Sequence, residues 1–269
     1  MLDKFGRTID TIRISVTDKC NLKCYYCIPD ETDYYSSKNI LSYEEIYEVV
    51  KEAASLGITR AKLTGGEPLI RKEITKLIGL IRSVKQINDI SITTNGTLLE
   101  NLVIPLKEAG LDRINISLDS LDENLYKEIT RGGELEKVIS GIFFTNKYFY
   151  GKIKINTVLL KNKNENEIPK IKEFCNDNNL SFQLINQMNL QNDKHYSENF
   201  GTTNKPNDCS LCNRIRLTSD GKLLPCLFSN IEIDIKNFSN IKDALILCIN
   251  QKIEKGEKRI DRNMVNIGG

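Results

Sequence analysis

Short β-branched runs alternate with helical patterns along most of the chain, and this alternation restricts the possible folds more than any other feature. Six strand candidates occur between residues 9 and 187, and segments with helical periodicity separate them. Consecutive strand–helix units predict a parallel sheet with helices outside it, either open or curled into a barrel. The predicted strands read "IDTIRISV", "RAKLT", "DISITT", "RINIS", "KIKINTVLL" and "SFQLIN".

Helix signals between these strands support the same interpretation. Ser42 followed three residues later by Glu45 forms a capping-box pattern, and Gly57 occupies the C′ position expected after the last apolar residue. Similar apolar spacing predicts helices over residues 74–81 and from about residue 165. A last helix is expected over 240–256, "NIKDALILCINQKIEKG".

Unusual residues follow several predicted strands. "TGGEP" covers residues 64–68, "TTNG" covers 93–96 and "SLDS" covers 117–120. Because the carboxyl ends of parallel strands build the active sites of α/β proteins, these segments are expected to contact a ligand.

Composition excludes several classes of protein. The net charge of +2 comes from dispersed charges, so neither a nucleic-acid partner nor an acidic tail is expected. No apolar run reaches the roughly 18 residues of a membrane span, and the first residues show no signal-peptide pattern. We therefore expect a cytoplasmic protein with no membrane contact. In that compartment, closely spaced cysteines favour metal or redox chemistry over disulfides.

A cysteine triplet, "CNLKCYYC", follows the first predicted strand. Cys20, Cys24 and Cys27 are compatible with a zinc site that takes a distant fourth ligand, since zinc sites pair their cysteines. The compact CxxxCxxC spacing favours a [4Fe–4S] cluster with three thiolates and one iron open to a small molecule.

A second triplet lies in "CSLCNRIRLTSDGKLLPC". Taken alone, Cys209, Cys212 and Cys226 are also compatible with a zinc ribbon that lacks one ligand. We favour the interpretation that each triplet binds an iron–sulfur cluster that lacks one protein ligand. Three further residues could act as ligands, but each has a simpler explanation. Cys175 and Cys248 continue the apolar faces of predicted helices and are expected in the core, and His195 lies in a polar loop and is expected in solvent.

With these motifs in view, the chain resembles the radical S-adenosylmethionine (SAM) superfamily, in which CxxxCxxC follows the first strand of a partial barrel. Within it, the chain is most similar to the GTP 3′,8-cyclase family. The similar segments include "LTGGEPLIR", "AGLDRINISLDSLD", "CNRIRLTSDGKLLPCLF" and the terminal "IGG". The resemblance implies a partial (β/α)6 TIM-type barrel over residues 1–190. It also implies a C-terminal region, 191–269, that carries an auxiliary iron–sulfur cluster.

The resemblance also implies a reaction. Enzymes of this family convert GTP to (8S)-3′,8-cyclo-7,8-dihydroguanosine 5′-triphosphate in molybdenum cofactor biosynthesis. The expected cofactors are SAM and two [4Fe–4S] clusters. An electron donor such as flavodoxin or ferredoxin is expected, with the protein a monomer or homodimer.

Family patterns assign roles to individual residues. Implied contacts to SAM are made by Tyr26, Gly65, Gly66, Glu67, Ser117 and Met188. Implied contacts to GTP are made by Arg13, Lys62, Thr93, Lys154, Arg214 and Arg216. The terminal Gly268 and Gly269 are expected to enter the active site, where Arg13, Arg214 and Arg216 have catalytic roles.

Residue patterns bear on the basic positions independently of the family. Arg214 and Arg216 lie two apart, so on an extended segment both face one side and suit phosphate oxygens. Arg13 and Lys154 alternate with apolar neighbours. A basic side chain that points into a barrel needs an anion, either a ligand or a carboxylate in the core.

Three departures from the family leave the substrate open. Position 62 is lysine where arginine is usual, which removes the bidentate fork. The segments between Met188 and Cys209 and after Cys226 are shorter than is usual in the family. Before Met188, Asn186 and Gln187 stand where the family usually has an acidic sequence. The main alternative is a radical SAM enzyme that modifies a peptide or another small molecule. A non-catalytic zinc or iron–sulfur scaffold is the second alternative.

Overall fold

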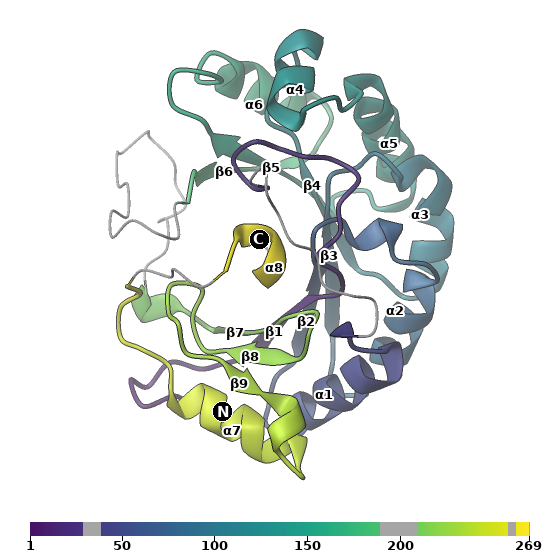
Figure 1. Ribbon diagram of the computed structural model, residues 1–269. Coiled ribbons are helices and arrows are strands. Elements are labelled where there is room, and N and C mark those ends of the chain that lie inside the picture. The colour runs from purple at the N-terminus through teal and green to yellow at the C-terminus, as the bar shows by residue number, and fades with distance from the viewer. Residues whose placement is uncertain (29–38, 189–208, 258–261, 269) are drawn as a thin grey trace.

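The fold is a curved sheet with helices along its outer side (Figure 1). The computed structural model describes residues 1–28, 39–188, 209–257 and 262–268 of the chain. The nine strands of the described residues follow the order β6-β5-β4-β3-β2-β1-β7-β8-β9. Neighbours from β6 to β7 are parallel, and β8 and β9 are antiparallel additions. The expected α/β fold with a parallel sheet is confirmed.

The six predicted strands are present as β1 to β6, with nearly the predicted ends, whereas β7, β8 and β9 were not predicted. Their bounds are β1 Thr11–Ser15, β2 Arg60–Thr64, β3 Asp89–Thr94, β4 Arg113–Ser117, β5 Ile153–Leu159, β6 Ser181–Asn186, β7 Arg214–Leu217, β8 Lys222–Leu224 and β9 Ile233–Asp234. The helices are α1 Tyr43–Ser55, α2 Ile74–Arg82, α3 Leu99–Glu108, α4 Glu123–Thr130, α5 Leu135–Tyr148, α6 Glu167–Asp177, α7 Ile241–Asn250 and α8 Met264–Ile267. Short 3₁₀ turns occupy η2 Pro68–Ile70, η3 Cys209–Leu211 and η4 Ile235–Asn237.

Alternation along the strands separates the apolar core from the interior of the curve. Ile12 and Ile14 of β1 are fully buried in the core, whereas Arg13 between them points to the opposite face. Helix α1 begins at the predicted capping box, with Ser42 and Glu45 bonding to each other's backbone amides. Cys175 and Cys248 are fully buried in the core, as predicted.

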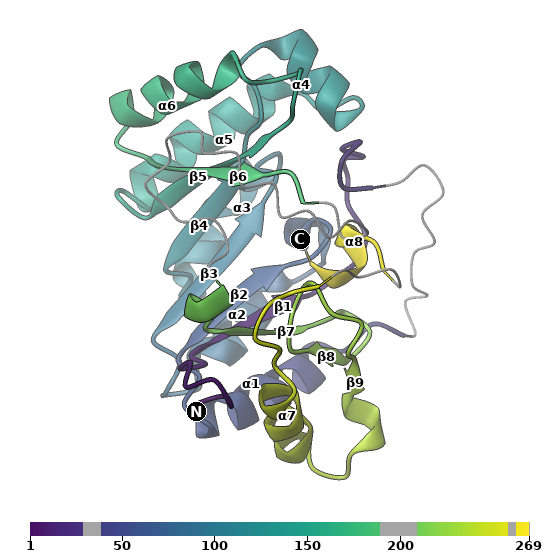
Figure 2. The ribbon, with the colours of Figure 1, turned by 90° about the vertical axis from the view of Figure 1, so that its left-hand side faces the viewer.

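Strand β7 joins the sheet at the free edge of β1. The two strands pair in parallel, and Arg216 of β7 lies directly beside Arg13 of β1. One sheet therefore runs through both segments of the chain, although the division near residue 190 stays a prediction. In both views α8 lies within the curve of this sheet (Figures 1 and 2).

One predicted helix is too long. The expected helix over 240–256 ends as α7 at Asn250. Beyond it Lys252 is buried, and the backbone carbonyls of Ile253 and Glu254 accept hydrogen bonds from Arg7. These long-range contacts replace the last helical turns. In the described part of the chain, no helix combines the length and apolar character needed to cross a membrane.

The two glycines of "TGGEP" pack against the backbone of the first cysteine loop. A Cβ at Gly65 would lie 2.5 Å from the Thr17 carbonyl oxygen, and one at Gly66 would lie 2.2 Å from that of Lys19. The amide of Gly66 donates to the Thr17 carbonyl at 2.7 Å. The glycines thus allow the loop after β2 to support the loop after β1.

Gly66→Ala is expected to lower the free energy of unfolding by about 3 kcal/mol, because the new methyl group meets backbone that cannot move aside. Gly79→Ala is the matched control. Its Cβ would enter open space in the middle of α2, so stability should change by at most about 1 kcal/mol, in the stabilising direction. Urea unfolding of both variants measures the difference, and equal stabilities would contradict the packing role.

Candidate active site

The first cysteine triplet forms a compact loop beyond β1, on the same side of the sheet as α8 (Figure 2). Cys20, Cys24 and Cys27 are all partly buried and carry no disulfide. The amide of Cys27 donates to the Cys24 carbonyl at 3.0 Å, and the amide of Leu22 donates to the Cys20 sulfur at 3.4 Å. The amide of Tyr25 donates to a carbonyl at the end of α4, which ties this loop to the barrel.

The three thiols oppose each other's ionisation. Burial, together with the charges of Cys20 and Asp119, raises the pKa of Cys27 to about 12. Burial raises the pKa of Cys20 to about 11, and burial followed by Asp119 and both other thiols raises that of Cys24. Grouped buried thiolates need a cationic centre, which iron supplies. This donor set fits a cluster with three protein ligands.

Two buried carboxylates hold the surrounding loops in place. Glu67 accepts from the amides of Leu69 (3.0 Å) and Asn95 (2.7 Å) and from the Thr94 hydroxyl (2.7 Å). Its carboxylate is therefore committed to protein contacts, and burial raises its pKa to about 7. Asn95 in turn donates to Asn21 at 2.8 Å, beside the cysteine loop.

Asp119 is a site residue that sequence reasoning missed. Its carboxylate accepts from the Tyr26 hydroxyl at 2.7 Å and from the Val158 amide at 2.8 Å. Burial raises its pKa to about 6. The position of Asp119 in "SLDS", after β4, was the available signal. The bond from Tyr26 fixes the aromatic ring next to Cys27.

Basic side chains form a row across the interior of the curve. Arg216, Arg13 and Lys62 occupy matching positions on β7, β1 and β2. Farther along the sheet, Thr93 and Lys154 flank Asn115 of β4 on matching positions. The sheet thus places the predicted substrate residues on one surface.

Burial and neighbouring cations lower the pKa values of Arg13 and Lys62. Burial lowers the pKa of Arg13 well below its usual value, and the charges of Arg216 and Arg214 lower it further. Burial also lowers the pKa of Lys62 well below its usual value. The charges of four neighbouring cations lower it as well: Arg13, Lys154, Arg214 and Arg216. The Thr93 hydroxyl oxygen is buried and makes no hydrogen bond to any described residue. An anion with hydrogen-bonding groups would relieve this repulsion.

The C-terminal tail reaches these cations. The Gly268 carbonyl accepts from Arg216 at 3.1 Å. Gly268 has a positive φ of 71°, and a Cβ there would lie 2.9 Å from that of Ser15. Ile267 belongs to a small apolar cluster with Leu224, and the predicted SAM contact Met188 packs against this cluster. Gly269 lies outside the described residues, as do His195 and the whole 189–208 segment.

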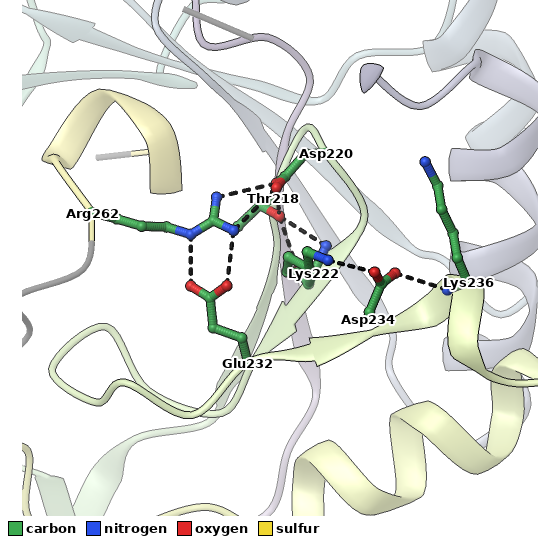
Figure 3. Close-up of polar contacts among 7 residues, drawn as sticks. All are labelled: Thr218, Asp220, Lys222, Glu232, Asp234, Lys236 and Arg262. Carbon is green, nitrogen blue, oxygen red and sulfur yellow. Dashed lines mark hydrogen bonds and ion pairs between the residues drawn. The ribbon is translucent and has the colours of Figure 1, made fainter. Parts of the chain in front are cut away.

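A pair of carboxylates fixes the chain just before the tail (Figure 3). The Arg262 guanidinium binds both oxygens of Glu232, at 2.6 and 2.8 Å, and both oxygens of Asp220, at 3.2 and 3.0 Å. Arg262 is largely buried, so these paired contacts exceed a surface ion pair in strength. Lys222 and Asp234 form a second ion pair in the same β-hairpin region.

The second cysteine triplet lies beside β7 and β8. Cys209 begins η3, and the backbone amide of Cys212 donates a hydrogen bond to the Cys209 carbonyl at 3.2 Å. Burial raises the pKa of Cys212, but Lys252 and Arg214 outweigh this and hold it below its usual value. The charge of Cys212 contributes to the raised pKa of Cys226, whose largest cause is burial. Cys212 and Cys226 are thus neighbours in a basic setting.

Among the described residues, no three His, Cys, Asp or Glu side chains converge as on a single metal ion. In a [4Fe–4S] cluster each thiolate binds a different iron, so the ligands stand farther apart than around one ion.

Comparison with known proteins identifies the class. The Radical SAM superfamily model matches residues 14–175. Streptococcus suis SuiB bound to S-adenosylmethionine aligns with a TM-score of 0.68 and 18% identity, over 87% of this chain and 65% of SuiB. The anSMEcpe structure with bound AdoMet aligns with a TM-score of 0.66 and 19% identity, over 91% of this chain and 81% of anSMEcpe. The chain belongs to the radical SAM superfamily.

Curated relatives narrow the assignment. A GTP 3′,8-cyclase of Clostridium botulinum (strain Langeland) is 39% identical, with both chains fully covered, and one of Petrotoga mobilis is 35% identical, also over both full lengths. Within the superfamily, the chain belongs with the GTP 3′,8-cyclases. The first alignment runs over 319 positions against 269 residues here, so the relative carries segments that this chain lacks.

Arg262→Gln is expected to free the tail, because both ion pairs of that residue are lost. The backbone amides of residues 263–268 should then exchange with solvent roughly tenfold faster. Hydrogen–deuterium exchange with mass spectrometry measures this directly. Lys236→Gln serves as the control, since the Lys236 side chain points away from the network (Figure 3). Unchanged exchange in the tail of Arg262→Gln would show that other contacts hold it.

Proposed function

We propose that this protein is a GTP 3′,8-cyclase that forms (8S)-3′,8-cyclo-7,8-dihydroguanosine 5′-triphosphate from GTP for molybdenum cofactor synthesis. The observation that carries the proposal is the row of partly or fully buried cations on adjacent strands, in a chain whose full-length relatives bear that name. A triphosphate matches the charge of this row, and the tail contacts the row at Arg216.

The first triplet supports a [4Fe–4S] cluster with SAM at its open iron. When bound, this pair supplies the 5′-deoxyadenosyl radical that removes the 3′ hydrogen of the ribose. The protein's part is to hold and orient both molecules and to exclude water. Tyr26, Ser117 and Met188 are the proposed SAM contacts. Gly65, Gly66 and Glu67 serve them indirectly, through the loop packing and the hydrogen bonds described above.

The basic row supports binding of the triphosphate. Arg13, Lys62, Lys154, Arg214 and Arg216 bring five positive charges to one face of the sheet, and burial disfavours the charges of Arg13 and Lys62. A bound triphosphate would neutralise most of this charge, and the buried Thr93 hydroxyl is available to hydrogen-bond it. Gly268, whose carbonyl contacts Arg216, is the proposed contact of the tail at this site, and an active-site role for Gly269 stays a prediction.

The second triplet supports an auxiliary [4Fe–4S] cluster near the guanine end of the substrate. Its donors are three partly buried cysteines beside Arg214 and Arg216. In this proposal residues 1–190 form the SAM-binding unit and 191–269 form the auxiliary-cluster unit. Electrons would come from a flavodoxin or ferredoxin, with the protein as a monomer or homodimer.

A competing function is modification of a peptide or another small molecule. The observation that favours it is the missing length relative to the curated cyclases, since a shorter chain leaves more room at the substrate end. Lys62 in place of an arginine removes one bidentate phosphate contact and also weakens the cyclase assignment.

Anaerobic turnover separates the two functions. Reconstituted, reduced protein with SAM and GTP is expected to form 5′-deoxyadenosine together with a nucleotide isomeric with GTP, measured by mass spectrometry. Lys62→Met should raise the KM for GTP roughly tenfold, since a charge-assisted contact is lost. Lys172→Met, an exposed lysine on α6, is the matched control and should leave KM unchanged.

Formation of deoxyadenosine with GTP left intact would refute the cyclase assignment while preserving the radical chemistry. Iron analysis tests the clusters separately. About eight iron atoms per chain are expected from two [4Fe–4S] clusters, and about four in Cys212→Ser. An unchanged iron content in Cys212→Ser would remove the auxiliary cluster from the proposal.

A further inference from the structure

Lys252 is a buried cation at the second cysteine triplet. Its side chain is among the largest fully enclosed ones in the described structure, and the residue is 2% exposed. Its ammonium group donates to the Cys212 sulfur at 3.5 Å, to the Arg214 carbonyl at 2.8 Å and to the Pro225 carbonyl at 2.9 Å. The three contacts join both sides of the triplet, because Pro225 directly precedes Cys226.

The environment of Lys252 lacks the partner that the nearby buried cation has. Arg7 also binds this region, donating to the Cys209 carbonyl at 2.7 Å, and its charge is balanced by Asp3 at 2.6 Å. For Lys252 no carboxylate lies within ion-pair distance among residues 1–28, 39–188, 209–257 and 262–268. A buried ammonium is costly unless an anion or a full set of acceptors meets it. Two carbonyls supply dipoles, and the third contact is sulfur.

We propose that Lys252 is the built-in counter-charge of the auxiliary cluster, holding Cys212 and Cys226 together and stabilising the reduced form of the cluster. The inference rests on the auxiliary cluster of the proposed function. Three thiolates around a [4Fe–4S]²⁺ core give a net charge of −1, and addition of one electron makes it −2. A fixed positive charge favours the more negative state, and hydrogen bonds to ligand sulfurs are among the features that set cluster potentials.

Position along the chain explains why Lys252 reaches this site. Helix α7 ends at Asn250, and Arg7 holds the carbonyls of Ile253 and Glu254. The chain between these points turns inward toward Cys212. Lys255, three residues later, is exposed, which makes it a control of the same residue type on the same segment.

The test uses the full chain with Cys20, Cys24 and Cys27 replaced by serine, so that only the auxiliary cluster is present. After anaerobic reconstitution, iron is counted, and the cluster is titrated with dithionite while the reduced form is followed by electron paramagnetic resonance. Reduction adds one electron and no proton. Lys252→Met is expected to lower the ratio of reduced to oxidised cluster about tenfold at a fixed potential. For a one-electron couple this equals about 59 mV. Lys255→Met should match the parent.

An intact cluster with an unchanged midpoint in Lys252→Met overturns the proposal. If Lys252→Met fails to retain iron, Lys252→Gln keeps a polar donor toward the carbonyls without the charge. A lower midpoint potential of the cluster in Lys252→Gln supports the role of Lys252 as counter-charge. Loss of iron from this variant, with an unchanged melting temperature of the cluster-free protein, supports it as well. Loss of iron with a lowered melting temperature in both variants indicates a structural role only and overturns it. If the parent itself holds no iron, the auxiliary cluster of the proposed function has failed, which is a distinct result.

Discussion

The parallel pairing of β7 with β1 is the contact on which the site depends. It joins residues more than 200 positions apart in sequence and places Arg216 beside Arg13. The same pairing places Cys212, which precedes β7, at the start of β1, whereas the first cysteine triplet follows the end of β1. Without it, the interior of the sheet would contain only part of its positive charge, and the tail would have no arginine to bind.

Buried charge is concentrated in this interior, and the molecule handles it in two ways. Where the structure itself must be stable, each cation has a carboxylate, as Arg7 has Asp3 and Arg262 has Asp220 and Glu232. Where a ligand is expected, cations stand close together, and the charge of Arg13 lowers the pKa of Lys62. Perturbed ionisation that recurs in one cavity is typical of functional sites. The contrast within one chain separates scaffold from site.

The loops around the first cysteines form a layered support. Gly65 and Gly66 leave room for the backbone of the cysteine loop to pack closely against them. Glu67, the next residue, binds the amide of Asn95 in the loop after β3. The carboxylate of Asp119 does the same for Tyr26. Residues that family patterns associate with SAM therefore act, in part, by fixing the loops that would bind it. Such second-layer contacts keep ligand-binding groups in one geometry.

Local patterns in the sequence determined the strands, the helix caps, the buried faces and the spacing of both cysteine triplets. β2, β3, β4 and β6 match their predicted segments, because period-2 alternation and β-branched residues act over a few neighbours. Resemblance to a family then indicated the cluster ligands and the basic substrate residues. Asp119 and Asn95 lay in strand-end segments already marked as ligand candidates.

Only the tertiary structure decided which distant groups meet. The pairing of β7 with β1, the bond from Arg216 to Gly268 and the fastening of Arg262 join segments whose local sequence carries no record of the partner. Lys252 is the clearest case, since helical spacing placed it on a continuing helix. The energy of burying its ammonium beside Cys212 depends on surroundings that come from other parts of the chain. Local propensity cannot encode such a contact, because its free energy exists only once the strands and loops have assembled.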